Sequence, residues 1–308
     1  LSGDGLEVTA VSDVSGGGGR AIADRHGARF RDRWEDLIAA ETIDFAFAFG
    51  RPVEMPVIGE AVGRAGVRCA LEKPCGIDLA GVQGLARLAA AADHVVAVPY
   101  LYRIGPLREA LAELAGGLPG RFHHMSFRFI GGPPGRYLET NCPWMLDCAQ
   151  SGGGALMNLG GHFVDLVSLL TGETAKDVVA VTSDSAYGAG IEDYAALTIR
   201  TDGGAVAVVE AGYTFPSAGE ALREFSFTLR SDAHYVTSTG DGLIVRDVAR
   251  PSEAGRHIGV ELRNERYYPM FVTDTLARFR RGEPPACGLG EAVEVMDVMV
   301  RAYRSAQT

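Results

Sequence analysis

Only two lysines are present among the 29 basic residues of this 308-residue chain, and one of them, Lys73, occupies a position suited to chemistry. It lies in the sequence Glu72-Lys73-Pro74, directly after the apolar run of residues 67–71, which predicts a buried strand. Ligands of open α/β sheets bind at the carboxyl ends of strands. A lysine ammonium shifts its pKa readily and binds a single oxygen, unlike the wide guanidinium of arginine. Lys73 is therefore a candidate catalytic residue, although a solvated lysine in a turn would explain the same residues.

A second segment, residues 151–170, has the hydrophobic spacing of a helix. Its apolar residues recur at intervals of three and four: Leu156, Leu159, Phe163, Leu166 and Leu170. Asn158, His162 and Asp165 follow one another at four and three, so they share one polar face. Two adjacent glycines precede His162, and each costs about 1 kcal/mol relative to alanine inside a helix. They predict close approach of a ligand or another backbone beside His162; a satisfied core histidine is the alternative.

Together the two segments resemble the glucose–fructose oxidoreductase, inositol dehydrogenase and rhizopine-catabolism (Gfo/Idh/MocA) family. In that family Glu-Lys-Pro follows a strand, and a later helix reads Gly-Gly-Gly-x-Leu-x-Asp-x-Gly-x-His-x-x-Asp. The resemblance implies that Lys73, Asn158 and His162 form the catalytic group, and that Glu72 and Pro74 shape the cofactor side of the cleft. It also implies an NAD(P)-binding, Rossmann-like domain and a sheet domain that forms homodimers or homotetramers. Asn158 stands where the family pattern has a carboxylate, so His162 should be a weaker base here.

Composition narrows the possible partners. With 47% hydrophobic and 22% charged residues, the chain is long enough for two domains with separate cores. Its net charge of −10 offers no basic field to attract nucleic acid or an anionic membrane, and no stretch of about 18 apolar residues lacks a charge. Five cysteines without a CxxC pair fit a reduced, cytoplasmic protein. His123 and His124 would point to opposite faces of a strand, so no metal site is predicted.

The first domain is expected to comprise residues 1–118. Strand-like and helix-like stretches alternate there, which predicts an α/β fold with a parallel sheet. The predicted strands are residues 6–14, 43–49, 67–71 and 94–99, and the predicted helices are residues 20–26, 31–41, 55–66, 78–92 and 106–114. Residues 1–5 read as a loop leading into a strand. We therefore expect the natural chain to start earlier, with a first strand and its glycine-rich phosphate loop upstream.

Residues 119–308 favour an α+β domain with a large, mostly antiparallel open sheet, because strand-like runs follow one another without helices. These runs are residues 122–130, 177–184, 194–200, 205–213, 225–230, 234–238 and 243–248. We expect the helix at residues 154–170 to cover the sheet, and two helices near residues 269–280 and 290–306 to close the chain. The Pro- and Gly-rich residues 131–135 are expected to form a lid over a cleft between the domains.

Asp13 ends the first predicted strand, where a carboxylate of a dinucleotide-binding fold accepts hydrogen bonds from the adenosine ribose. A carboxylate there repels a 2′-phosphate, so NAD is favoured over NADP, although Arg20 could pair with such a phosphate. A helix N-cap is the alternative role for Asp13. Four consecutive glycines at 16–19 match the glycine-rich dinucleotide template only weakly, and we expect a flexible turn there.

Polar-tipped and aromatic residues on predicted loops and strand ends suit a polyhydroxylated ligand. Those assigned to the substrate are Arg103, Tyr137, Trp144, Asp165 and Tyr213, each of which also fits ordinary packing. On the strength of the resemblance, we expect an NAD(P)-dependent oxidoreductase that acts on an alcohol or ketone of a sugar, cyclitol or similar small molecule. Lys73 and His162 would carry the proton chemistry, oriented by Asn158. Two alternatives remain: a ligand-binding or regulatory relative without catalysis, and an NAD-assisted glycosidase on the same fold.

Overall fold

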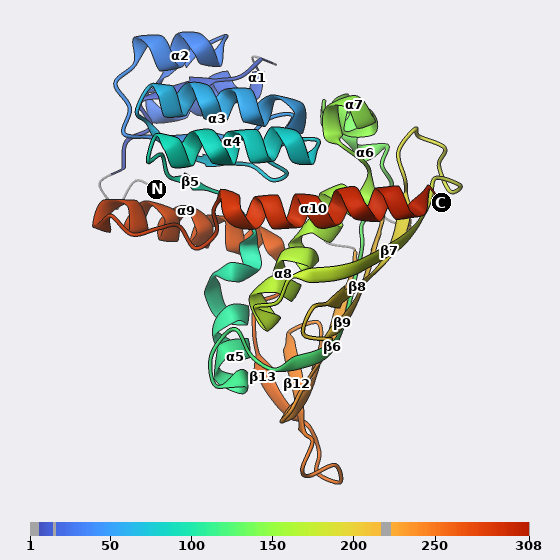
Figure 1. The fold of residues 1–308 in the computed structure, drawn as a ribbon. Helices are drawn as coiled ribbons and strands as arrows, with labels where there is room; N and C mark the ends of the chain where they lie inside the picture. The colour runs from blue at the N-terminus through green and yellow to red at the C-terminus, as the bar shows by residue number, and fades with distance from the viewer. Residues whose placement is uncertain (1–5, 15–16, 217–222, 308) are drawn as a thin grey trace.

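The computed structural model describes residues 6–14, 17–216 and 223–307 (Figure 1). The loop expected at residues 1–5, and Gly16 of the glycine run, lie outside the described residues.

The first part of the chain alternates short strands with helices. Its elements are β1 (Ala10–Ser12), α1 (Gly17–His26), β2 (Arg29–Arg31), α2 (Trp34–Ala40), β3 (Phe45–Ala48), η1 (Pro52–Glu54), α3 (Met55–Arg64), β4 (Arg68–Leu71), α4 (Leu79–Ala91) and β5 (Val96–Ala97). All strand pairings within it are parallel, as predicted, but they form two ladders, β1–β2 and β3–β4–β5. Among the described residues no ladder joins β1 to β3.

The glycine run is helical where it is described, so the expectation of a flexible turn was wrong for Gly17–Gly19. These residues form the first turn of α1, and the Gly19 amide donates to Asp13 Oδ2 at 2.8 Å. A Cβ on Gly19 would lie 2.3 Å from the Cβ of Asp13. Glycine is required at this position because α1 starts in direct contact with Asp13, the residue that follows β1.

The second part of the chain is built on an eight-stranded sheet. It is preceded by η2 (Leu101–Arg103) and α5 (Gly105–Ala115). Its strands are β6 (Phe122–Ile130), β7 (Ala175–Ser183), β8 (Tyr194–Thr201), β9 (Val206–Gly212), β10 (Glu224–Ser231), β11 (His234–Ser238), β12 (Gly242–Asp247) and β13 (Arg256–Gly259). The order is β13-β12-β11-β10-β6-β9-β8-β7, and only the β6–β9 pairing is parallel. The predicted large, mostly antiparallel sheet is confirmed.

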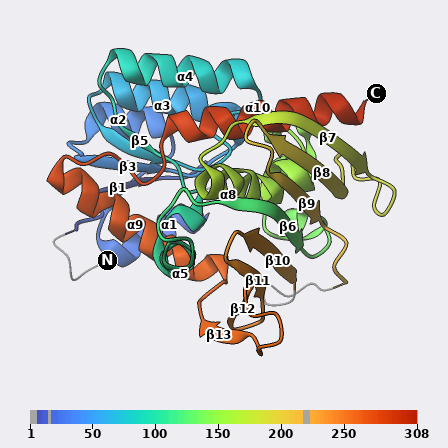
Figure 2. The same cartoon turned by 60° about the horizontal axis from the view of Figure 1, so that its bottom comes forward.

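The helical elements of this part are α6 (Arg136–Glu139), η3 (Pro143–Leu146), α7 (Cys148–Ser151), the π-helical turn η4 (Leu156–Gly160), α8 (Gly161–Thr171), α9 (Asn264–Arg281) and α10 (Leu289–Ala306). Of these, η4, α8 and α10 pack against the sheet. Helix α10 packs against α4 on one side and against α8 and β7 on the other (Figures 1 and 2). The boundary expected after residue 118 remains a prediction.

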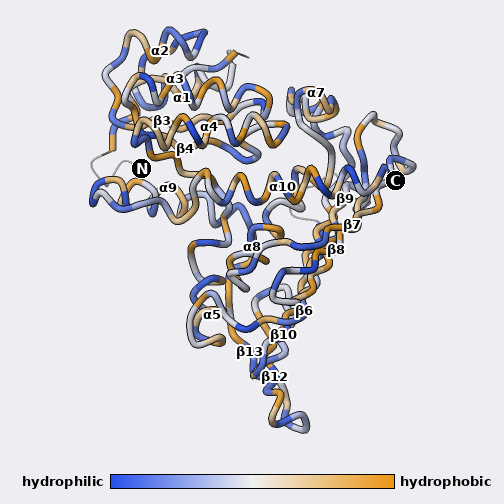
Figure 3. Tube along the Cα trace, in the orientation of Figure 1, coloured by the Kyte–Doolittle hydropathy of each residue, from blue (hydrophilic) through white to orange (hydrophobic). Residues whose placement is uncertain are grey.

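A single hydrophobic cluster extends through both parts of the molecule. It includes Leu85 of α4, Phe127 of β6, Phe163 of α8 and Met299 of α10. Figure 3 shows hydrophobic colour along β7, β8 and β9, where the sheet meets the covering helices. None of the described helices combines the length and apolarity needed to cross a membrane. The two parts therefore meet along α10, and the segment between β4 and α4 lies at their junction.

Candidate active site

Lys73 follows β4 and contacts the helix of the second part of the chain. Its Nζ donates to the main-chain oxygen of Asn158 at 2.6 Å and to Asn158 Oδ1 at 3.2 Å. The Lys73 main-chain amide donates to Glu72 Oε1 at 3.1 Å. Burial lowers the pKa of Lys73 and the charge of Glu72 opposes this, while burial raises the pKa of Glu72. Two of the three ammonium protons are thus fixed on Asn158, and the third has no partner among the described residues.

The side-chain amide of Asn158 is fully engaged. Its Oδ1 accepts from Lys73, and its Nδ2 donates to the hydroxyl of Tyr137 at 2.8 Å and to that of Tyr213 at 3.0 Å. Arg136 Nη2 donates to the Tyr137 hydroxyl at 3.0 Å. The guanidinium carbon lies 4.7 Å from the Tyr137 ring centre and 5.1 Å from that of Tyr213. We call these five residues the Lys73 network.

His162 is buried on α8, one helical turn beyond Asn158. Its Nδ1 has no hydrogen-bond partner among the described residues. The edges of Tyr100 and Tyr102 contact the imidazole, with ring centres 6.1 Å away in both cases. Burial, and then the charge of Lys73, hold the pKa of His162 well below 6.5. The lowered pKa favours the neutral imidazole, which is the form that can accept a proton.

Arg103 and Asp165, both predicted to bind substrate, pair with each other. Arg103 Nε donates to Asp165 Oδ1 at 2.7 Å, and Arg103 Nη1 lies 3.6 Å from Glu291 Oε1. Burial raises the pKa of Asp165 to about 7, against the opposing charge of Arg103. Asp165 Oδ2 has no partner among the described residues. This buried pair fixes η2, which carries Tyr102, to the helix that carries His162.

The remaining predicted site residues are Asp13, Pro74 and Trp144. Asp13 Oδ2 accepts from the Gly19 amide in the first turn of α1, but α1 begins at Gly17, so Asp13 is not its N-cap residue, and its role toward a cofactor stays a prediction. Pro74 continues the Glu72–Lys73 segment through a cis peptide bond. Trp144 lies half-buried in η3, and no hydrogen bond or ring contact between it and the network is found among the described residues.

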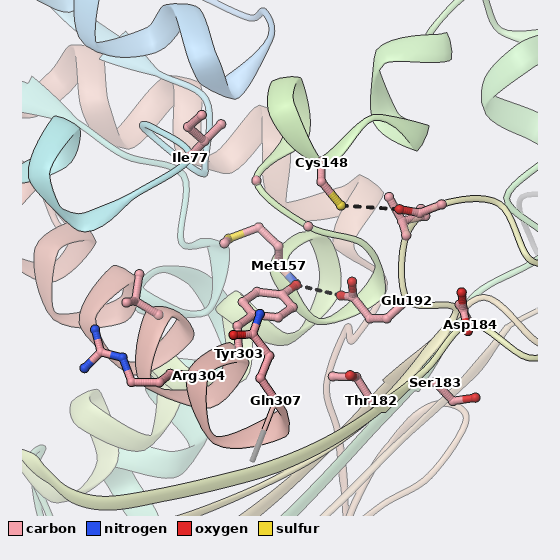
Figure 4. Close-up of a pocket in the computed structure, with 15 residues that line it drawn as sticks. Ile77, Cys148, Met157, Thr182, Ser183, Asp184, Glu192, Tyr303, Arg304 and Gln307 are labelled. Atoms are coloured by element: carbon pink, nitrogen blue, oxygen red, sulfur yellow. Dashed lines mark hydrogen bonds between the residues drawn. The ribbon is translucent and has the colours of Figure 1, made fainter.

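The helix of the site is anchored by Glu192, a residue that sequence reasoning missed. Glu192 Oε2 accepts from the Gly154 amide at 2.8 Å, and Oε1 accepts from the Leu156 amide at 3.0 Å and from the Tyr303 hydroxyl at 2.6 Å. A Cβ on Gly154 would lie 2.2 Å from the Glu192 main-chain oxygen. Glu192 and Tyr303 line a pocket of about 590 Å³ beside the start of η4 (Figure 4). Packing against Glu192 explains this glycine.

The two glycines before His162 do not have the close backbone neighbour that was one of the two explanations expected. A Cβ on Gly160 would meet the side chain of Leu156 at 2.8 Å, and a Cβ on Gly161 would have ordinary contacts at 3.7 Å or more. The close neighbour of Gly160 is therefore a side chain of its own helical segment. Close approach of a ligand stays a prediction.

Comparison with known proteins identifies the family of the C-terminal domain. Residues 107–229 match the model of the GFO/IDH/MocA C-terminal domain. A putative UDP-kanosamine synthase oxidoreductase subunit from Amycolatopsis mediterranei (strain S699) is 28% identical over 189 residues, which are 60% of this chain. The aligned region spans about half of that relative's length, 50%.

Solved structures share the fold over nearly the whole chain. An oxidoreductase from Agrobacterium radiobacter, solved with NAD+, L-tartaric acid and magnesium, has a TM-score of 0.84 and 17% identity, covering 97% of this chain and 89% of that one. The WlbA dehydrogenase from Bordetella pertussis, solved with NADH and UDP-GlcNAcA, has a TM-score of 0.79 and 19% identity, covering 98% and 87%. The family model includes Asn158 and His162 but not the Glu-Lys-Pro segment. Residues 107–229 therefore belong to the C-terminal domain of the Gfo/Idh/MocA family, and the chain as a whole shares the fold of the solved oxidoreductases.

Proposed function

We propose that this protein is an NAD-dependent dehydrogenase or reductase that transfers a hydride between the nicotinamide and an alcohol or ketone of a sugar, cyclitol or similar molecule. The observation that carries the proposal is a Lys73 ammonium with one proton not bound to Asn158, together with a His162 imidazole whose pKa is lowered by burial and by the charge of Lys73 and whose Nδ1 has no partner among the described residues. A buried, unsatisfied nitrogen is costly in a folded protein. The two groups together support a reacting group as their common partner.

The residues of this chain would perform the proton chemistry. A bound nicotinamide would supply the acceptor or donor of the hydride. During oxidation, His162 takes the hydroxyl proton of the substrate, because its lowered pKa keeps it neutral. Lys73 donates its third N–H to the same oxygen and stabilises alkoxide character. Asn158 fixes the direction of that N–H by holding the other two protons of the ammonium.

Asp13, Glu72 and Pro74 are proposed to hold the cofactor. Asp13 sits at the carboxyl end of β1, and a carboxylate at such a strand end favours the ribose hydroxyls of NAD over the 2′-phosphate of NADP. One of its oxygens is occupied by the Gly19 amide at 2.8 Å. Structural neighbours solved with NADH or NAD support the choice of cofactor.

The proposal of a sugar substrate is supported by structural neighbours that act on sugars. A levoglucosan dehydrogenase solved with NADH and levoglucosan has a TM-score of 0.83 with 17% identity, covering 98% of this chain and 88% of that one. The alternative of a protein without catalysis is favoured by one observation, the neutral Asn158 in place of a carboxylate. Against it, the amide oxygen still binds the Lys73 ammonium at 3.2 Å.

Cofactor binding tests the proposal. Calorimetric titration should give tighter binding of NADH than of NADPH, and Asp13→Asn should narrow the difference while keeping an oxygen for the Gly19 amide. Asp24→Asn, on the exposed side of α1, is the matched control. A panel of sugars and cyclitols with NAD+ then separates the alternatives. NADH formation supports the dehydrogenase, release of an aglycone without net NADH points to the glycosidase, and no nicotinamide binding refutes the proposal.

We also infer a homodimer or homotetramer through the open face of the sheet. Val179 and Val181 of β7 are 60% and 70% exposed, whereas Ala180 between them is buried. Analytical ultracentrifugation should find an oligomer, and Val181→Asp should weaken it. A monomer at all concentrations would contradict this inference.

A further inference from the structure

We propose that Arg136 and Tyr137 bind an oxyanion group of the substrate, a carboxylate or a phosphoryl group, and that Asn158 creates this preference by turning Tyr137 into an obligatory hydrogen-bond donor. The inference rests on the proposed function, because the group belongs to the molecule that is oxidised or reduced beside Lys73. It concerns recognition of the substrate rather than the proton chemistry.

The first step is the orientation of the Asn158 amide. The Lys73 ammonium has donors only, so the atom that faces it at 3.2 Å must be the oxygen of the amide. The NH2 group then faces the tyrosine hydroxyls, at 2.8 Å for Tyr137 and 3.0 Å for Tyr213. Both hydroxyl oxygens therefore accept. A carboxylate at position 158 would reverse this polarity, since it has no proton to give and the tyrosines would donate to it.

The second step is the capacity of the Tyr137 hydroxyl. Its oxygen accepts from Asn158 Nδ2 at 2.8 Å and from Arg136 Nη2 at 3.0 Å. A hydroxyl oxygen has two acceptor positions, so both are filled and only its proton remains available. Without ligand the hydroxyl neighbouring that proton is the one of Tyr213, which burial keeps neutral. An oxyanion is a stronger acceptor than a neutral phenol and would take its place.

Exposure selects Tyr137 as the hydroxyl that meets the ligand. Tyr213 is fully buried, and burial raises its pKa well above 10, so it stays protonated behind Asn158. Tyr137 is half-buried on α6, directly after the predicted lid at residues 131–135. Gly131 is fixed to the sheet by its amide, which donates to the Gly212 oxygen at 2.8 Å. Arg136 and Tyr137 thus stand on a segment anchored at the edge of the site.

The third step is charge. Arg136 has no carboxylate within 4 Å in the part of the chain that the structure describes. Its Nη1 donates to the main-chain oxygens of Gly132 and Pro133. Asn158 brings no charge, and burial raises the pKa of Glu72, the carboxylate beside Lys73. The Lys73 network therefore holds two basic groups, Lys73 and Arg136, around one fixed hydroxyl donor. Guanidinium groups are well suited to carboxylates and phosphates, which they bind through charge-assisted hydrogen bonds.

Paired probes test this inference. D-Glucuronate, D-glucose 6-phosphate and D-glucose share most of their hydroxyl groups and differ in charge, so calorimetric dissociation constants with and without NADH report the preference directly. We expect one or both anions to bind at least about tenfold tighter than glucose, the size of effect that one charge-assisted hydrogen bond gives. Preference for glucuronate alone assigns a carboxylate, and preference for glucose 6-phosphate alone assigns a phosphoryl group.

Variants assign the preference to these residues. Arg136→Gln should remove most of the preference for the anions over glucose. Arg87 is an exposed arginine of α4, and Arg87→Gln should leave this preference unchanged. Asn158→Asp should lower it at least about tenfold by reversing the polarity of Tyr137 and adding a negative charge. Tyr137→Phe should lower the preference for the anions, and Tyr235→Phe, on the exposed side of β11, should not.

The outcomes distinguish this inference from the proposed function. Equal affinity for glucose and both anions, no binding of either anion at the highest soluble concentration, or an unchanged preference in Arg136→Gln would overturn the inference. If NADH binding persists in that case, the proposed function stands without it. If the protein prefers the anions but binds no nicotinamide, the inference of an oxyanion site stands and the proposed function is refuted.

Discussion

Replacing Lys73 by arginine separates a catalytic ammonium from a solvated cation. Lys73→Arg keeps the charge and changes only the shape of the group that carries it. Two hydrogen bonds join the native ammonium to Asn158, with donor–acceptor distances of 2.6 Å and 3.2 Å, and the third N–H is left for the substrate oxygen. A planar guanidinium is wider and cannot present three donors from one point. We therefore expect the reacting oxygen to lose its donor.

The expected loss follows from the role of that donor. Removing one preorganised donor to a developing oxyanion costs about 10²–10³-fold in turnover, or about 2.7–4 kcal/mol of transition-state stabilisation. Lys176→Arg is the matched control, because Lys176 is the chain's other lysine and is exposed on β7. That change should alter stability by no more than about 0.5 kcal/mol and leave turnover unchanged.

The assay is turnover at saturating NAD+, with melting temperature measured in parallel on both variants. A large fall in turnover for Lys73→Arg, in a protein that still melts cooperatively, is the expected result. Near-normal turnover of Lys73→Arg would refute the catalytic role of the Lys73 ammonium, because any cation at this position would then support turnover. A Lys176→Arg variant as impaired as Lys73→Arg would show that the loss has another origin.

Three further predictions follow from the same site. Asn158→Asp should raise the pKa of His162, since a carboxylate one helical turn away favours the imidazolium, and an NMR titration without upward movement would contradict this. The folded-state pKa of His162 lies below 6.5, so just below that pH the unfolded chain binds more protons than the folded protein, and the folded protein should lose stability as the pH falls. In thermal melts between about pH 5 and pH 7, the melting temperature of His162→Gln should therefore depend less on pH than that of the unmutated protein. Gly154→Ala would place a Cβ 2.2 Å from the Glu192 main-chain oxygen and should lower the free energy of unfolding by about 1–3 kcal/mol. Gly290→Ala in α10 meets no atom within 4 Å and should leave the free energy of unfolding unchanged or raise it. Urea unfolding of both variants checks the difference.

Long elements were predictable from the sequence, and short ones were not. The expected strand at residues 122–130 has the bounds of β6, because nine residues give an apolar alternation that can be recognised. Strand β2 was missed, since Phe30 between two arginines offers no such pattern. Strand β13 was missed for the same reason: its four residues, Arg256–Gly259, include a single large apolar side chain.

The site was predictable where its residues belong to local patterns. Lys73 could be recognised from the strand before it, and Asn158 and His162 from helical spacing. Tyr137 and Tyr213 were assigned to the substrate, but their contact with Asn158 spans 21 and 55 residues of chain, and no local pattern records such a pairing. The pairing of Arg103 with Asp165, 62 residues apart, was missed because each charge alone suits a polar ligand.

Turnover of His162→Gln tests the central claim most directly. The claim is that a neutral, buried imidazole beside Lys73 exchanges the substrate proton during hydride transfer. With NAD+ and a sugar that the unmutated protein oxidises, His162→Gln should form NADH about 10²–10⁴-fold more slowly at pH 7, the range expected for a lost general base. Its affinity for NADH should stay the same. Undiminished NADH formation by His162→Gln would contradict the account, because the proton would then have another acceptor.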